Sequence, residues 1–340
     1  MQSDKPLRRF YLLTYPRTAS NLLLKILALE DQPNVKSGSY FFLPLHALRL
    51  DHGSESTHIE ALAPDQKQKE IKCMKGCFSR LIQHLTEAEA KNQLTFVKEH
   101  TTFLTEPVAK TRAIDGQNSV TDEMPWMLDE QNGLTQPMEG RSVHNETLLS
   151  DSFLKTWKPS FLIRHPALAF PSYYRAVVRI GGEDYARSSR MRRYNRYMMT
   201  LRWTRQLYDF YADHFAATES AQGSCNDCNL WPLVLDADDV ITHPTVVAKF
   251  CDLVGLDATK LKFKWEKERQ ERSPREKAMM STIDESTGVN PSKATGCVDI
   301  DKEAARWKTE FGEDIGQMID TFVREAMPDY MFLRSKRLRP

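Results

Sequence analysis

The stretch from Arg9 to Leu27 constrains the fold more than any other part of the chain. Residues 10–13 are large and apolar, as expected for a strand that is covered on both faces. Pro16 then ends the strand, because proline has no amide hydrogen to give to a sheet. Residues 22–29 are apolar apart from Lys25, which is typical of a helix. The stretch therefore predicts a buried strand, a tight polar turn and a helix.

The turn carries groups that suit an anion. Thr18, Ser20 and Asn21 are residue types that cap helix N-termini, and Arg17 adds a positive charge. A helix start presents backbone N–H groups and the positive end of the helix dipole, so the turn predicts a phosphate or sulfate site. An ordinary strand-to-helix turn with a surface arginine also fits these residues.

Strands and helices alternate along the rest of the chain. Residues 93–100, 160–166 and 231–235 are expected to be strands. The expected helices span residues 65–91, 167–178, 185–215, 245–254 and 302–327. This alternation predicts an α/β fold in which a central parallel sheet is flanked by helices.

Lys98 and His100 come at the end of the second predicted strand. Ligands of open parallel sheets bind outside the carboxyl ends of the strands, so both side chains are expected to face the same crevice as the first turn. Glu99 is expected on the opposite face of the strand. A histidine after a strand is also compatible with a surface or packed residue, so its role stays open at this point.

Residues 105–150 are polar and contain Gly116, Gly133 and Gly140. They are a candidate loop or lid insertion in a single domain that spans residues 1–340. Two further groups keep two interpretations each. The arginine-rich run at 187–205 is a solvated helix face or a cover over anionic groups. The following aromatic residues line an acceptor pocket or pack in the core: Tyr40, Phe41, Phe42, Trp126 and Trp157.

Charge and composition exclude several classes of protein. The 47 basic residues almost balance the 46 acidic ones, so overall charge does not indicate nucleic acid binding. The sequence has no apolar run long enough to span a membrane and no recognisable signal peptide. The six cysteines are therefore expected to be reduced thiols in the cytosol. Cys73 with Cys77 and Cys225 with Cys228 have spacings that only weakly suggest zinc, and we expect no metal.

The order of these motifs resembles the sulfotransferase family. Residues 14–21, Thr-Tyr-Pro-Arg-Thr-Ala-Ser-Asn, resemble the family's phosphosulfate loop T-Y-P-K-S-G-T-T. Lys98-Glu99-His100 resembles its K-T-H segment, and Arg164 with Ser172 matches its 3′-phosphate-binding pair. Residues 233–255 and 306–308 resemble its later strand–helix unit and the end of its G-x-x-G-D-W-K segment. The resemblance covers roughly residues 8–310.

The resemblance implies a P-loop fold, the donor 3′-phosphoadenosine 5′-phosphosulfate and the product adenosine 3′,5′-bisphosphate. It makes His100 the general base, with Lys98 and Arg17 as further catalytic residues. It also implies that the donor is bound by the following residues: Arg17, Thr18, Ala19, Ser20, Asn21, Leu22, Arg164, Ser172 and Lys308. Arginine, lysine and the helix dipole supply the positive charge in this scheme, so it requires no metal.

The chain departs from the family pattern in the loop and near the C-terminus. Arg17 replaces a lysine, Ala19 a glycine and Asn21 a threonine, and the glycines before Trp307 are missing. Arginine keeps the charge but replaces a point charge by a planar fork. The loop therefore suggests a divergent cytosolic member that contains an arginine in place of the lysine.

The sequence as a whole predicts a cytoplasmic sulfotransferase that acts on a hydroxyl or amine of a small metabolite. Its expected partners are this acceptor and the nucleotide donor, with no nucleic acid and no membrane. A homodimer is compatible with the sequence. Alternatives are a family member with another reaction on a natural product, and a member that binds a nucleotide without turnover. A P-loop kinase is disfavoured because no G-x-x-x-x-G-K-[ST] run is present.

Overall fold

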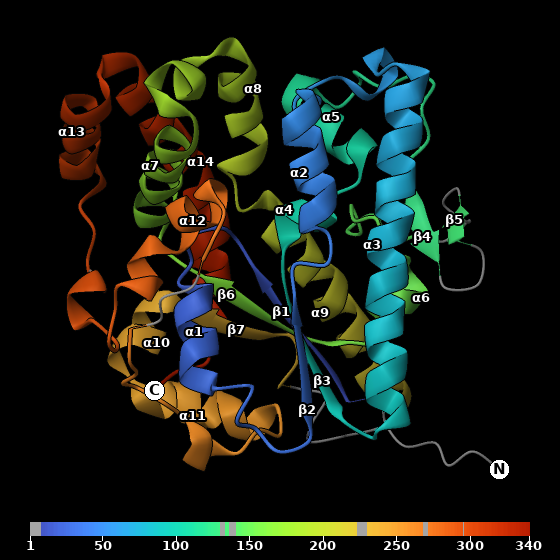
Figure 1. Cartoon of the computed structure of the whole chain (residues 1–340), viewed down its shortest axis with the longest axis vertical. Coiled ribbons are helices and arrows are strands. Elements are labelled where there is room, and N and C mark those ends of the chain that lie inside the picture. The colour runs from blue at the N-terminus through green and yellow to red at the C-terminus, as the bar shows by residue number, and fades with distance from the viewer. Residues whose placement is uncertain (1–7, 130–132, 136–140, 223–229, 268–270, 295) are drawn as a thin grey trace. The chain divides into compact units, whose positions relative to one another are not determined.

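The computed structural model describes residues 8–129, 133–135, 141–222, 230–267, 271–294 and 296–340. At its centre is a parallel sheet of five strands in the order β2-β3-β1-β6-β7 (Figure 1). The strands are β1 (Arg9–Thr14), β2 (Val35–Ser39), β3 (Leu94–His100), β6 (Lys158–Ile163) and β7 (Leu233–Asp236). The predicted α/β class with a central parallel sheet is confirmed.

The register of the strands places the carboxyl ends of β1, β2 and β3 side by side. β1 pairs with β3 so that Thr14 lies opposite His100, and β2 pairs with β3 so that Ser39 lies opposite Lys98. All residues of β1 and β3 are buried. Strands covered on both faces need continuous apolar sequence, which explains why residues 10–13 could be recognised as a strand.

Contacts divide the chain into two compact units. The first contains residues 1–14, 34–161 and 202–233, and the second contains residues 15–33, 162–201 and 234–340. A single domain over residues 1–340 therefore stays a prediction. Within the described residues, no helix is both long and apolar enough to cross a membrane.

The first unit holds most of the small elements and the longest helix. That helix, α3, buries Met74, Leu81 and Leu85 along one side, and it confirms the helix predicted at 65–91. The elements of this unit outside the sheet are α2 (Leu43–His52), η1 (Ile59–Ala61), α3 (Pro64–Ala90), α4 (Thr101–Leu104), α5 (Pro107–Asp115), β4 (Met127–Asp129), β5 (Gly133–Thr135), α6 (Asp151–Leu154) and α9 (Arg202–Gln222).

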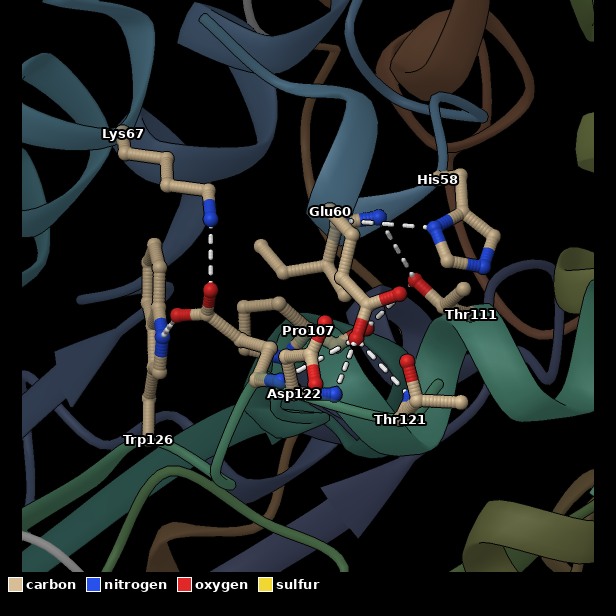
Figure 2. A network of polar contacts seen from close by, with 10 residues as sticks. His58, Glu60, Lys67, Pro107, Thr111, Thr121, Asp122 and Trp126 are labelled. Atoms are coloured by element: carbon tan, nitrogen blue, oxygen red, sulfur yellow. Dashed lines mark hydrogen bonds and ion pairs between the residues drawn. The ribbon is translucent and has the colours of Figure 1, made fainter. Parts of the chain in front are cut away.

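Part of the predicted insertion at 105–150 is held in place by a polar network that is partly buried and partly exposed. Figure 2 shows the Glu60 carboxylate accepting the backbone N–H groups of Thr121 at 2.8 Å and Asp122 at 2.6 Å. Glu123 in turn pairs with Lys67 and accepts the indole N–H of Trp126 at 2.9 Å. These contacts anchor residues 121–126 to η1 and α3. A lid function of residues 105–150 stays a prediction.

The second unit contains the helix of the first predicted motif and the C-terminal helices. Its elements are α1 (Ser20–Leu27), α7 (Pro166–Arg187), α8 (Ser189–Met198), α10 (Ala237–Thr242), α11 (Pro244–Leu253), η3 (Ala258–Lys260), α12 (Pro274–Asp284), η4 (Pro291–Lys293), α13 (Ile300–Phe311) and α14 (Glu313–Ser335). The single helix predicted at 302–327 is wrong. Gly312 has φ +87°, far from the values of a regular helix, and it separates α13 from α14.

Candidate functional site

The turn between β1 and α1 is wound tightly by two left-handed residues. Arg17 has φ +70° and Ala19 has φ +63°, and the Thr18 hydroxyl donates to the Tyr15 carbonyl at 2.8 Å. Left-handed residues turn neighbouring backbone N–H groups toward one concave side, which suits an anion. Glycine adopts this conformation without strain, so Ala19 is held there by its surroundings. The predicted tight turn is confirmed.

The capping role predicted for the turn residues is wrong. The N-cap of α1 is Ala19, and in the described part of the chain no side chain caps this helix. Thr18 uses its hydroxyl to close the turn instead. The positive end of the α1 dipole is therefore not satisfied by a protein side chain, as an anion-binding helix start requires.

Arg17, Arg164 and Ser172 lie together in the second unit. The Arg17 Nε donates to the Ser172 hydroxyl at 3.0 Å, and the Arg164 Nη1 donates to the Arg17 carbonyl at 3.1 Å. Burial lowers the pKa of Arg164, while Asp238 and Asp236 raise it. Three of the residues that the sequence assigned to the donor are thus joined by direct contacts, although their roles stay predictions.

Two later segments also reach these residues. Met279 on α12 accepts an Arg17 N–H with its carbonyl, and the Asn21 amide lies 2.8 Å from the Met280 sulfur. Lys293 in η4 accepts from Arg164 Nη2 with its carbonyl at 3.1 Å. Sequence reasoning missed α12 because its contacts with Arg17 and Asn21 join residues that are more than 250 positions apart.

Lys308 lies on α13, where its ammonium pairs with Glu313 at 2.8 Å. Its predicted donor contact stays a prediction. Several arginines of the 187–205 run are engaged in ion pairs: Arg187 and Arg192 with Asp314, Arg202 with Glu146, and Arg205 with Asp209. These pairs agree with the interpretation of a partly solvated, ion-paired helix face.

At the end of β3 in the first unit, a hydrogen bond to Thr14 orients the His100 ring. The His100 Nδ1 lies 2.6 Å from the Thr14 hydroxyl, which itself donates to the Glu99 carbonyl at 3.2 Å. With the Thr14 hydroxyl hydrogen donated to the Glu99 carbonyl, Nδ1 is the donor in the shorter contact. His100 then carries its hydrogen on Nδ1 and has a lone pair on Nε2, as a general base requires.

Burial keeps both predicted catalytic side chains of β3 close to neutrality. It holds the pKa of His100 well below its ordinary value, assisted by the charges of Lys98 and His46. It also lowers the pKa of Lys98 to about 7, although Glu99 acts in the opposite direction. The His100 ring is therefore neutral at neutral pH, whereas the ammonium of Lys98 titrates in this range.

Aromatic rings surround His100 in the first unit. The Tyr40 and Phe103 rings have their centroids 4.9 and 5.0 Å from the His100 ring. Tyr40 also lies over the Lys98 ammonium, 4.1 Å from it, and His46 packs on Phe103. Of the aromatic residues with two interpretations, Tyr40 thus lies at the candidate site, whereas Phe42 and Trp157 are buried in the core.

Possible metal ligands do not cluster in the described part of the chain. No group of three His, Cys, Asp or Glu side chains is placed there to hold an ion. Cys73 and Cys77 are free thiols on α3, and Cys225 and Cys228 lie outside the described residues.

Comparison with known proteins supports the resemblance. No protein-family model matches the chain. A Metarhizium rileyi protein named "Sulfotransferase ppzF" is 40% identical to it over 339 residues, which cover 97% of this chain and 96% of that protein. A Metarhizium majus protein with the same name is 40% identical over 347 residues, covering 99% and 98% of the two chains. Since these relatives match over nearly their whole length, the chain belongs to the sulfotransferase family and is a transferase.

Proposed function

We propose that the donor is 3′-phosphoadenosine 5′-phosphosulfate and that the acceptor is a hydroxyl or amine of a small metabolite. The observation that carries this proposal is the cluster of Arg17, Arg164 and Ser172 beside the uncapped start of α1. A donor with anionic groups at two positions needs two cations, and this cluster supplies two guanidinium groups and a hydroxyl that contacts one of them. Guanidinium groups bind phosphate through two parallel N–H bonds, which suits both ends of such a donor.

The reaction moves one sulfuryl group and one proton. The acceptor oxygen or nitrogen attacks sulfur, a new bond to sulfur forms, and the bond from sulfur to the leaving phosphate oxygen breaks. His100 takes the acceptor's proton at Nε2, because Nδ1 is occupied by its bond to Thr14. Arg17, Lys98 and the amides at the start of α1 offset the negative charge that develops on the leaving phosphate.

Binding of the product nucleotide tests the donor assignment. Adenosine 3′,5′-bisphosphate should raise the melting temperature of the protein, while adenosine 5′-phosphate should do so less and ATP with magnesium hardly at all. Arg164→Ala should remove most of the advantage of the bisphosphate over the monophosphate. Arg175→Ala is the matched control, because Arg175 lies on the same helix as Ser172 but pairs with Glu310. A bisphosphate that does not stabilise the wild-type protein would refute the proposed donor.

The titration of Lys98 predicts how donor affinity depends on pH. Lys98 is charged below its pKa of about 7 and neutral above it, so affinity for an anionic donor should fall as pH rises. The expected loss reaches up to about tenfold per pH unit between about pH 7 and 9, measured with radiolabelled donor in equilibrium dialysis. Lys98→Arg should abolish this loss, because arginine stays charged throughout.

The control for this titration is Lys158→Arg, since Lys158 also lies over an aromatic ring in the first unit. It should keep the wild-type pH dependence. An alkaline loss of equal size in Lys98→Arg would assign the titration to another group.

A further inference from the structure

Glu99 differs from the threonine of the family's K-T-H segment, and the structure gives it a definite set of contacts. Its side chain is fully buried. One carboxylate oxygen accepts the backbone N–H of Phe42 at 3.0 Å, and the other accepts the N–H of His100 at 3.1 Å. Burial raises the pKa of Glu99 to about 8, while the amides of Phe42 and His100 act in the opposite direction and satisfy its two oxygens.

The segment that Glu99 holds is the turn of Tyr40, Phe41 and Phe42 between β2 and α2. Phe42 is the N-cap of α2 and provides no side-chain cap, and Glu99 accepts the N–H of this N-cap residue, as the glutamate of a capping box does. Tyr40 has φ +56°, an uncommon conformation for a bulky residue. Such a conformation persists only where neighbouring contacts enforce it. The Tyr40 N–H donates to the Lys98 carbonyl at 2.9 Å, which anchors the other end of the turn.

The turn connects the two faces of β3 at its carboxyl end. Successive side chains of a strand point to opposite faces, so Glu99 lies on the face away from Lys98 and His100, as the sequence predicts. The Tyr40 ring nevertheless lies over Lys98 and beside His100. Glu99 can therefore influence the surroundings of Lys98 and His100 by fixing the backbone of the turn that carries Tyr40.

We propose that Glu99 is a positioning residue that, by binding the Phe42 amide, keeps Tyr40 over Lys98 and His100 as a wall of the acceptor site. The role of this wall in acceptor binding rests on the proposed function. The bond by which Glu99 holds the turn of residues 40–42, which we call the clasp, does not. The wall excludes water from Lys98, whose side chain is almost wholly buried. It also limits how an acceptor can approach the Nε2 of His100.

Acetylation of Lys98 tests the clasp without donor or acceptor. The protein is treated briefly with acetic anhydride, and modification of Lys98 relative to Lys158 is measured by mass spectrometry. Tyr40→Leu and Glu99→Thr should each raise this ratio roughly tenfold, because both expose the amine. The double variant should resemble either single one, since both changes remove the same wall. Glu99→Gln should give a smaller rise, because its carbonyl still accepts the Phe42 N–H while its NH₂ group opposes the amide of His100.

The matched control is Glu106→Thr. Glu106 is also a buried carboxylate that caps a helix start, accepting the N–H of Val108 at 2.8 Å and that of Ala109, but it belongs to α5. It should leave Lys98 acetylation unchanged. The clasp is refuted if Glu99→Gln and Glu99→Thr leave Lys98 as protected as in the wild type, or if Glu106→Thr exposes it equally.

Transfer assays then separate the clasp from the proposed reaction. With radiolabelled donor and naphthol as the acceptor probe, Glu99→Thr should raise the acceptor KM several-fold. A change in acetylation with an unchanged acceptor KM would refute the acceptor wall. A protein that shows the acetylation pattern but transfers no sulfuryl group in any form would refute the proposed function and leave the clasp standing.

Discussion

Replacing His100 with alanine should lower kcat for sulfuryl transfer by about 10² to 10⁴, the usual contribution of a general base. The loss arises because no other group would then accept the acceptor's proton at the point of attack. Affinity for adenosine 3′,5′-bisphosphate should stay near the wild-type value, since this residue has no assigned contact with the donor. The measurement pairs radiolabelled transfer to naphthol with a calorimetric titration of the bisphosphate. A large loss of bisphosphate affinity would instead make His100 structural.

His46→Ala provides the control for this substitution, because His46 belongs to the same group of rings but packs on Phe103. It should change kcat far less than His100→Ala. Thr14→Val gives a graded counterpart, because valine keeps the shape of threonine and removes the acceptor for the Nδ1 hydrogen. In ¹⁵N spectra the wild-type ring should show an unprotonated Nε2, and Thr14→Val should show a mixture of both tautomers. A wild-type ring protonated on Nε2 would contradict the proposed base.

The site residues that sequence reasoning found are all marked by patterns in the residues next to them in the chain. Arg17 follows a strand whose apolar run and terminal proline are legible in the sequence. Arg164 and Ser172 are eight positions apart across one strand-to-helix turn, so their separation in space is set by nearby backbone. The same locality explains the confirmed elements, such as α3, whose helical pattern needs no distant partner.

The contacts that it missed depend on the pairing of distant segments. Thr14 reaches His100 because β1 and β3 pair with these two residues in register, although they are 86 positions apart. Tyr40 reaches Lys98 because β2 pairs with the other edge of β3. No local pattern encodes a strand order, so neither contact could be derived from the sequence. The capping assignment failed for another reason, since Thr18 can serve its own turn as well as a helix.

Arg17→Ala should lower kcat/KM for the donor by about 10³, because it removes a charge that stabilises the leaving phosphate. Unlike His100→Ala, it should also weaken the bisphosphate, since the charge acts on bound nucleotide and on the transition state alike. Radiolabelled transfer and calorimetric titration measure the two effects. Arg175→Ala removes an arginine charge on α7 that is paired with Glu310, and it should change neither quantity appreciably.

Arg17→Lys distinguishes a need for charge from a need for the guanidinium shape. Lysine is the family residue at this position, but here the guanidinium contacts both the Ser172 hydroxyl and the Met279 carbonyl. An ammonium can satisfy such contacts one at a time but lacks the planar fork that holds two partners in fixed directions. We therefore expect Arg17→Lys to recover most of the bisphosphate affinity and only part of kcat/KM, about tenfold below wild type. If Arg17→Lys were as inactive as Arg17→Ala, the fork rather than the charge would be the essential feature of this loop.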